Sequence, residues 1–317
     1  MPSEANMAAS FIICAYNAAG RIGIPLASLA RMRLAGGAVF ELLVVDNNSK
    51  DGTAELVERH SATIELRAKG CAVRVLREER QGLLYARLRG LREARSNACC
   101  FVDDDVEVAE DFMEVGLREL APEDVALLIP RISGAYEKAP DGPVKRRETY
   151  LAVNEGMGEK RIEYGPKTLI APTVGAGMWL RRDAFMAAVP WQEPEKLLPD
   201  RIGKRLTSGG DYEFGILLGK AGYRRVYVPT LRARHHIPPG RLETRYFFRL
   251  MVGCLQSEFT LRAKYGGYEH TVGRRAKELA KVMVTAVLLG LPPYGGEGRR
   301  ERLFLLAGRW AQFKGAY

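Results

Sequence analysis

The chain has 317 residues, of which 47% are hydrophobic and 27% are charged, which is ample apolar material for a core and an ordinary share of charge for a soluble protein. No stretch reaches the roughly 20 consecutive apolar residues of a membrane-spanning helix, and no basic start marks a secretory signal. Five cysteines without CxxC spacing indicate reduced thiols in a cytosolic setting. The net charge of +10 belongs to residues 231–317, which hold 16 basic and 6 acidic residues.

Strand and helix patterns alternate through the first part of the chain. Short apolar runs predict buried strands at 10–15, 42–45, 72–76, 98–102 and 125–129. Helical spacing and helix-start residues predict helices at 21–33, 53–60 and 82–94. The alternation predicts a parallel sheet covered on both faces by helices. No glycine-rich dinucleotide fingerprint or P-loop motif occurs, which disfavours those nucleotide sites.

The second part of the chain is less regular. Residues 131–168 are polar and are typical of a mobile insertion. Further along, the patterns predict a β segment at 173–180, a helix at 214–220 and a strand at 224–228. Helical patterns then follow at 242–265, 269–291 and 297–314.

Three carboxylates, Asp103 to Asp105, directly follow the apolar run 98–102. Adjacent like charges repel, and burying them without a partner is costly. A bound Mg²⁺ or Mn²⁺ takes oxygen ligands and removes that cost, and ligand crevices of open α/β sheets lie outside the carboxyl ends of strands. The stretch therefore predicts a metal–diphosphate site. It fits an acidic turn before a helix equally well, because Glu110 and Asp111 continue the acidity.

Other positions also admit both a functional and a structural interpretation. Gly175 and Gly177 would let a ligand approach the backbone, and they would equally suit a bulge. Asp211 lies in the first turn of a predicted helix, where the helix dipole favours an acid whatever its function. His235 follows a predicted strand, and imidazole ligates divalent metals, although a lone histidine is more often structural.

Taken together, these stretches resemble the family-2 glycosyltransferases, which have the GT-A fold. The matching motifs, in chain order, are Cys-Ala-Tyr-Asn17, Val45-Asp-Asn-Asn-Ser-Lys-Asp-Gly-Thr53, Gln81-Gly-x-x-x-Ala-Arg87, Phe-Val-Asp-Asp-Asp105, Gly-Gly-Asp211, Ala-Gly-Tyr223 and His235-x-Ile-Pro-x-x-Arg241. Each is weak alone, but their order and spacing together are specific. The resemblance covers about residues 9–250 and leaves the last helices unexplained.

The resemblance implies a nucleotide-binding set at the strand ends. That set would be Ala15, Tyr16, Asn17, Asp46, Arg87, Asp103 and Asp104. Tyr16 would stack on the base, and Asp46 would accept a hydrogen bond from the N–H edge of the base. Arg87 would lie near the base or the diphosphate.

The resemblance also implies the residues of the reaction. Asp103 and Asp105 would form the D-x-D pair, with Asp105 and His235 as ligands of Mn²⁺ or Mg²⁺. Asp211 would be the general base of a one-step inverting displacement. Two glycines would contact the donor or acceptor sugar, Gly177 and Gly210. Whether His235 or the adjacent His236 is the metal or pyrophosphate ligand depends on register and stays open.

The predicted fold class is α/β of the GT-A type. It is Rossmann-like, with a mostly parallel sheet, helices on both faces and a helical C-terminal segment after it. The predicted catalytic domain is 1–240, with a nucleotide-binding half at about 1–125 and an acceptor half at about 126–240. Residues 241–317 form the basic helical segment.

The expected function is metal-dependent, inverting transfer of a sugar from a nucleotide-sugar donor, with UDP favoured over GDP or dTDP. The acceptor would be a hydroxyl of a glycan or a lipid-linked intermediate. Two alternatives stay open: transfer to a polyprenyl phosphate, and a non-catalytic membrane- or nucleic-acid-binding protein that retains the fold. Asp46, Asp211 and the acidic triplet argue against a retired site. No nucleic-acid partner is expected, because Tyr246 to Phe248 form one helical cluster rather than an interleaved stacking surface.

The expected location is cytoplasmic, with an anionic membrane surface as a candidate partner on the inner face. Four basic residues precede the apolar run 282–291, which two prolines end; they are Arg274, Arg275, Lys277 and Lys281. Ten residues make a helix of about 15 Å, half the hydrocarbon thickness. The run would therefore lie in the membrane interface or pack as a core helix, and the two interpretations are equally supported.

Overall fold

The computed structural model describes residues 7–34, 37–201, 208–266, 281 and 296–314. The chain forms two compact units that are interleaved in sequence. Unit 1 comprises Met1–Ala135, Ala152–Pro199 and Gly210–His236, and unit 2 comprises Tyr136–Leu151, Asp200–Gly209 and Ile237–Tyr317. The domain boundary at residue 240 stays a prediction. The compact units divide the chain differently, because Tyr136–Leu151 and Asp200–Gly209 belong to the same unit as the C-terminal segment.

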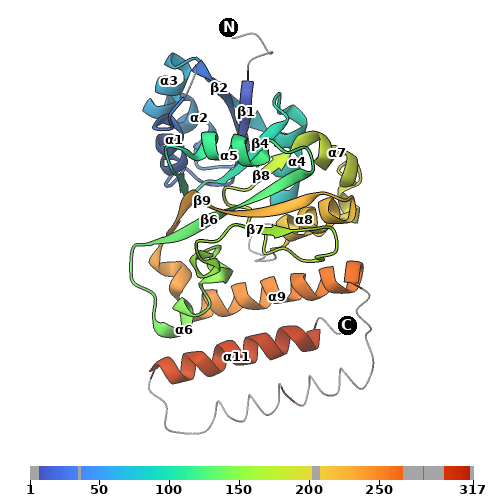
Figure 1. Cartoon of the computed structure of the whole chain (residues 1–317). Coiled ribbons are helices and arrows are strands. Elements are labelled where there is room, and N and C mark those ends of the chain that lie inside the picture. The colour runs from blue at the N-terminus through green and yellow to red at the C-terminus, as the bar shows by residue number, and fades with distance from the viewer. Residues whose placement is uncertain (1–6, 35–36, 202–207, 267–280, 282–295, 315–317) are drawn as a thin grey trace. The chain divides into compact units, whose positions relative to one another are not determined.

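A single mixed sheet forms the centre of unit 1 (Figure 1). Its strand order is β3 (Ala72–Arg77), β2 (Val39–Asp46), β1 (Met7–Ala15), β4 (Ala98–Asp103), β8 (Trp179–Arg181), β6 (Val125–Tyr136), β9 (Arg224–Ile237) and β5 (Val106–Val108), and β7 (Ile162–Tyr164) also pairs with β9. The pairs among β3, β2, β1 and β4 are parallel. The pairs of β8 with β4 and β6, and of β9 with β5 and β7, are antiparallel.

The antiparallel half differs from the parallel sheet that the alternation predicts. The β segment expected at 173–180 is a strand only at Trp179–Arg181, where it runs against both β4 and β6. The predicted insertion 131–168 is in part regular, because β6 continues through Tyr136 and β7 lies within it. The strand predicted at 224–228 continues to Ile237. Its second half alternates buried and solvent-facing residues, as expected of a sheet with one exposed face, and the arginines among them conceal the strand.

The helices of unit 1 cover both faces of the parallel strands. On one face lie α1 (Gly23–Ala30), α2 (Thr53–Arg59), α3 (Ser61–Ala68) and α5 (Phe112–Leu120). On the other lie α4 (Leu83–Glu93), α7 (Arg182–Ala188) and α8 (Gly210–Lys220). The sequence patterns missed α3. His60 separates α3 from α2, and Nδ1 of His60 accepts a hydrogen bond from the Ala62 amide in the first turn of α3. Single-turn 3₁₀ helices at Glu155–Met157 and Pro194–Lys196 complete the unit.

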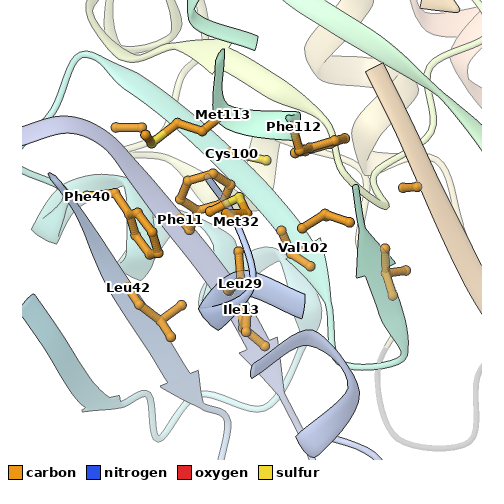
Figure 2. Packing of buried hydrophobic residues seen from close by; sticks show 14 of the residues in the cluster. Phe11, Ile13, Leu29, Met32, Phe40, Leu42, Cys100, Val102, Phe112 and Met113 are labelled. Carbon is orange, nitrogen blue, oxygen red and sulfur yellow. The ribbon is translucent and has the colours of Figure 1, made fainter. Parts of the chain in front are cut away.

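The core is divided by the sheet, because successive strand residues point to opposite faces. Phe11, Ile13 and Cys100 belong to one apolar cluster, and their neighbours Ile12 and Phe101 belong to the other. Figure 2 shows the first cluster, where side chains of α1 and α5 meet those of β1, β2 and β4. Such double-sided burial explains why these strands read as continuous apolar runs.

Unit 2 consists mainly of helices. It contains α6 (Gly142–Lys145), short 3₁₀ turns at Glu148–Leu151 and Pro239–Leu242, α9 (Thr244–Gly266) and α11 (Gly296–Lys314). Helices α9 and α11 pack side by side (Figure 1), with the Phe247 and Phe304 rings 4.9 Å apart. These two helices confirm the patterns at 242–265 and 297–314, whereas the helix predicted at 269–291 lies outside the described residues. Among the described residues, no helix is long and apolar enough to cross a membrane.

Candidate functional site

The site is built at the carboxyl ends of β1, β2 and β4, where parallel strands place their following residues at one edge. Ala15, the last residue of β1, pairs with Asp46, the last of β2, and Cys14 pairs with Asp103, the last of β4. Tyr16 follows at once, and its ring is 41% exposed although it is large and apolar. The buried Asp46 carboxylate accepts a hydrogen bond from the Ser49 amide at 3.3 Å. The sheet therefore brings the predicted base-binding residues to one edge.

The loops after β1 and β2 hold each other through side chains. Three consecutive amides of the first loop, from Asn17 to Ala19, donate to Ser49 Oγ, Thr53 Oγ1 and Asp51 Oδ2 at 2.9 to 3.0 Å. In return, Asn17 Oδ1 accepts from the Lys50 amide at 2.9 Å. These hydrogen bonds satisfy backbone N–H groups that have no partner in a helix or sheet, and they fix the shape of both loops.

The acidic triplet gives its three carboxylates different surroundings. Asp103 ends β4. Both oxygens of Asp104 accept from Arg21, with Nε to Oδ1 at 2.7 Å and Nη2 to Oδ2 at 2.6 Å. Burial raises the pKa of Asp104 to about 6, and the charges of Asp105 and Asp103 also raise it while Arg21 opposes them. Asp104 is therefore protonated more readily than an exposed aspartate, although Arg21 lies against both of its oxygens.

Asp105 lies beside a histidine from a distant part of the chain. Its Oδ1 is 3.2 Å from Nε2 of His235, and both side chains are buried. Their elements meet because β5, which directly follows Asp105, pairs with β9. The next residue, His236, points the other way and places its Nε2 3.4 Å from Glu107. Strand alternation thus places His235 beside the acidic triplet, and its role as a metal or pyrophosphate ligand stays a prediction.

A second carboxylate group lies at the start of α8. Asp211 is buried in the first turn, and its Oδ2 accepts from the Gly175 amide at 2.7 Å while Oδ1 accepts from the Tyr212 amide at 3.0 Å. A Cβ atom on Gly175 would lie 2.2 Å from Nη2 of Arg87 and 3.4 Å from the Asp211 carboxylate. Arg87 is buried, with its guanidinium 5.6 Å from the centre of the Phe101 ring. Arg87, Gly175 and Asp211 therefore meet, and a side chain at position 175 would displace the Arg87 guanidinium.

Of the two predicted sugar-contacting glycines, Gly177 has a local structural reason for its identity. Gly177 has a φ of +78°, and a Cβ there would lie 3.2 Å from Phe112 and from Pro130. Gly210 is buried at the beginning of α8. Their contacts with a sugar stay predictions.

Two residues of this region were not among the predicted ones. Gly175 had a signal, because it shares the small-residue stretch with Gly177. Arg21 had none, since its partner Asp104 lies 83 residues further along the chain. A pairing at such a distance follows from the topology of the sheet rather than from local spacing.

Comparison with solved structures places the fold of the chain in a known class. Solved structures that resemble it include the mannosyltransferase PcManGT from Pyrobaculum calidifontis in complex with GDP-Man and Mn²⁺, with a TM-score of 0.58, 17% identity, and coverage of 97% of this chain and 88% of that one. TarS 1–349 from S. aureus in complex with UDP-GlcNAc gives a TM-score of 0.55 at 16% identity, over 98% of this chain and 89% of that one. At such identities the likeness concerns the fold, which is that of the GT-A glycosyltransferases.

The chain belongs to glycosyl transferase family 2, whose sequence model matches residues 10–188. The matched stretch contains the acidic triplet, whereas Asp211 and His235 lie beyond it. The glycosyltransferase AglE of Haloferax volcanii is 24% identical over 68% of this chain and 63% of its own length. The uncharacterized glycosyltransferase YfnE of Bacillus subtilis is 36% identical over 34% of this chain and 25% of its own length. The chain thus spans less than two thirds of these relatives.

Proposed function

We propose that this enzyme transfers a sugar from a UDP-linked donor to a hydroxyl group of a glycan or lipid-linked acceptor, with inversion at the anomeric carbon and with Mn²⁺ or Mg²⁺. The observation that carries the proposal is the buried contact between Asp105 and His235 at the end of β4. A carboxylate and an imidazole brought together from distant segments, beside two further acids, suit a cation and its diphosphate ligand.

The residues fit a divalent ion that is bound only together with the donor. Asp105 and His235 would supply one oxygen and one nitrogen ligand. No cluster of three or more His, Cys, Asp or Glu side chains that could hold a metal occurs in the part of the chain that the structure describes. The other positions would fall to diphosphate oxygens and water, which is how Mg²⁺ is often held. When bound, such an ion supplies positive charge for the departing diphosphate.

The nucleotide would lie across the ends of β1 and β2. The exposed Tyr16 ring offers a stacking face, and the Asp46 carboxylate offers an acceptor for the N–H edge of a base. Both features suit uracil, whose N3–H is a donor. UDP-GlcNAc bound to TarS and GDP-Man bound to PcManGT support a nucleotide-sugar donor. We place UDP first, because the acidic and aromatic residues of this loop need only one donor on the base.

Asp211 would act as the general base of the transfer. Its carboxylate would take the proton from the acceptor hydroxyl as that oxygen bonds to the anomeric carbon. The bond from the anomeric carbon to the diphosphate oxygen breaks on the opposite side, which releases the nucleoside diphosphate and inverts the configuration. The Gly175 amide, at 2.7 Å, fixes the orientation of this carboxylate. Positioning of this kind contributes to catalysis through proximity.

Isothermal titration calorimetry of the parent protein and two variants with UDP, with and without Mn²⁺, tests the proposal. The parent should bind UDP more tightly with Mn²⁺, and Asp105→Ala should abolish that increment while the protein stays folded. Glu110→Ala is the matched control, because it removes an exposed acid from the same segment. The metal assignment is wrong if Asp105→Ala retains the full Mn²⁺-dependent increment. The donor assignment is wrong if GDP or dTDP binds the parent more tightly than UDP does.

A further inference from the structure

Arg21 lies in the turn before α1, and its guanidinium donates hydrogen bonds to two different loops. Nε and Nη2 donate to the two oxygens of Asp104 at 2.7 and 2.6 Å. Nη1 donates to the Asn17 carbonyl at 2.9 Å, and Nη2 also donates to the Tyr16 carbonyl at 3.2 Å. One side chain therefore joins the loop that follows β1 to the loop that follows β4.

This ion pair differs from an ordinary surface pair. Exposed pairs contribute little to stability on average, but bidentate arginine–carboxylate pairs are stronger and geometrically specific. The side chain of Asp104 is only 13% exposed and that of Arg21 is 39% exposed. The guanidinium also donates to two backbone carbonyls. One belongs to Asn17, whose φ of 46° lies in the left-handed region that residues other than glycine rarely adopt. A lysine cannot reproduce four such bonds.

The pairing also separates the roles of the three acids. Both oxygens of Asp104 are directed at Arg21, whereas Asp105 faces His235. Both oxygens of Asp104, which the family resemblance places in the nucleotide-binding set, are thus already hydrogen-bonded within the protein. Its charge is compensated by a protein cation instead of by a ligand.

We propose that Arg21 is a positioning residue that holds the Tyr16 loop in register with the acidic triplet, so that the base and the diphosphate of one nucleotide are bound at the same time. The proposal rests on the proposed function, which assigns Tyr16 to the base and Asp105 to the metal–diphosphate group. A ligand that spans two subsites gains affinity only when their spacing matches it. Arg21 supplies that match through Asp104, and it touches neither the base nor the phosphates.

A neighbouring ion pair provides a matched control. Arg31, at the end of α1, pairs with Glu107 at 3.0 Å, so it also links the α1 region to the segment after Asp105. Its side chain is directed at Glu107 instead of at the loop after β1. Arg31→Gln therefore removes an arginine–acid pair of the same kind without touching the Tyr16 or Asn17 carbonyls.

Amide hydrogen exchange of the full chain tests the coupling without any nucleotide. In Arg21→Gln and in Asp104→Asn, the amides of Asn17 to Ala19 should exchange about tenfold faster, because local opening of this loop becomes easier. In Arg31→Gln they should exchange at the parental rate. Arg21→Lys should fall between parent and Arg21→Gln, and it serves as the test variant if Arg21→Gln does not fold. Equal exchange in Arg21→Gln and Arg31→Gln overturns the proposal.

Titration with UDP and Mn²⁺ then tests the consequence for binding. Arg21→Gln and Asp104→Asn should each raise the Kd about tenfold, and the double variant should be no weaker than either single one, since both remove one interaction. Additive losses in the double variant contradict the assignment. If the parent itself binds no nucleotide, the proposed function fails, while the exchange experiment still decides whether Arg21 joins the two loops.

Discussion

At the scale of single residues, the surroundings of each carboxylate in this site determine its chemistry. Asp104 is held in the Arg21 fork, and Asp105 lies beside His235. In α8, Asp211 accepts from the Gly175 amide, whereas Glu213, two residues later, accepts from the Leu198 amide. The assignment of a base therefore depends on which carboxylate meets the sugar-binding region, and the two acids of α8 allow a direct comparison.

Asp211→Asn should lower the rate of sugar transfer by a factor of about 10² to 10⁴ while leaving the affinity for UDP and Mn²⁺ nearly unchanged, because a general base acts on the acceptor proton and not on the nucleotide. Asparagine keeps the size and one acceptor oxygen but cannot take a proton. The measurement is single-turnover transfer from the donor, with nucleotide affinity determined separately.

Glu213→Gln is the control for this variant, because it changes a buried acid of the same helical turn that faces the Leu198 backbone. It should retain close to the parental rate, whatever it does to stability. Parental turnover in Asp211→Asn together with a large loss in Glu213→Gln would transfer the role of base to Glu213.

At the scale of elements, sequence patterns predicted the parts of unit 1 that are buried on both faces. Runs such as 42–45 and 98–102 are continuous and apolar because β2 and β4 lie inside the sheet. The patterns failed where burial is one-sided or the element is short. The second half of β9 alternates buried and exposed residues, but its exposed positions include Arg232 and Arg234, so it does not form an apolar run. Strand β5 has only three residues, which is too short to show a period.

The candidate site was predictable to the extent that it depends on motifs at strand ends. Tyr16, Asp46 and Asp103 follow or end apolar runs, and the parallel pairing brings them to one edge. The choice between His235 and His236 required the register of β9 on β5. The contact of Arg87 with Gly175 required tertiary structure as well, because no spacing indicates which side chain fills the space beside a glycine.

A prediction at this scale concerns the junction of α11 with the residues after α6 in unit 2. Hydrogen bonds from Arg147 and Arg146 hold the pKa of Glu301 at about 2, below the ordinary value of 4.5. A depressed carboxyl pKa stabilises the folded state at pH values above 4.5, and this contribution is lost as the pH falls from 4.5 towards 2. Glu301→Gln should therefore destabilise the protein at pH 6, by about 1 kcal/mol after allowance for solvent screening.

Urea unfolding of parent and Glu301→Gln at pH 6 and pH 3 measures this effect, and the difference between the two proteins should shrink at the lower pH. Glu258→Gln is the control, because it removes an exposed i,i+4 partner of Arg262 on α9 and should change stability little at either pH. A destabilisation by Glu301→Gln that is the same at both pH values would show that the Arg147 contact acts through packing rather than through charge.

At the scale of the whole molecule, charge and family resemblance are distributed differently along the chain. The family match ends at residue 188, whereas residues 231–317 hold 16 basic and 6 acidic residues. Two large apolar side chains of α11 are solvent-facing, with Leu305 49% and Trp310 37% exposed. Exposed tryptophan and leucine among basic residues are typical of helices that bind a membrane interface. The C-terminal segment therefore combines basic charge with exposed apolar side chains.

We predict that the enzyme binds reversibly to anionic membranes through this segment. Arg274, Arg275, Lys277 and the apolar run 282–291, on which the hypothesis first rested, lie outside the described residues, so the prediction depends on their charge and on the exposed α11 side chains. Co-sedimentation with liposomes should require anionic lipid and weaken with salt, because screening shortens the reach of each charge.

Changing Arg274, Arg275, Lys277 and Lys281 to Gln should reduce this binding strongly, since each basic residue near an anionic surface contributes about 1 kcal/mol. A control variant removes four positive charges from exposed positions of unit 1 by changing Arg59, Lys69, Arg92 and Arg118 to Gln. If net charge alone attracts the protein, both variants lose binding equally, and the segment has no special role. If neutral and anionic liposomes recover the same amount of parent protein, charge does not direct the binding, and if neither recovers any, the segment does not dock on lipid; either result contradicts the prediction.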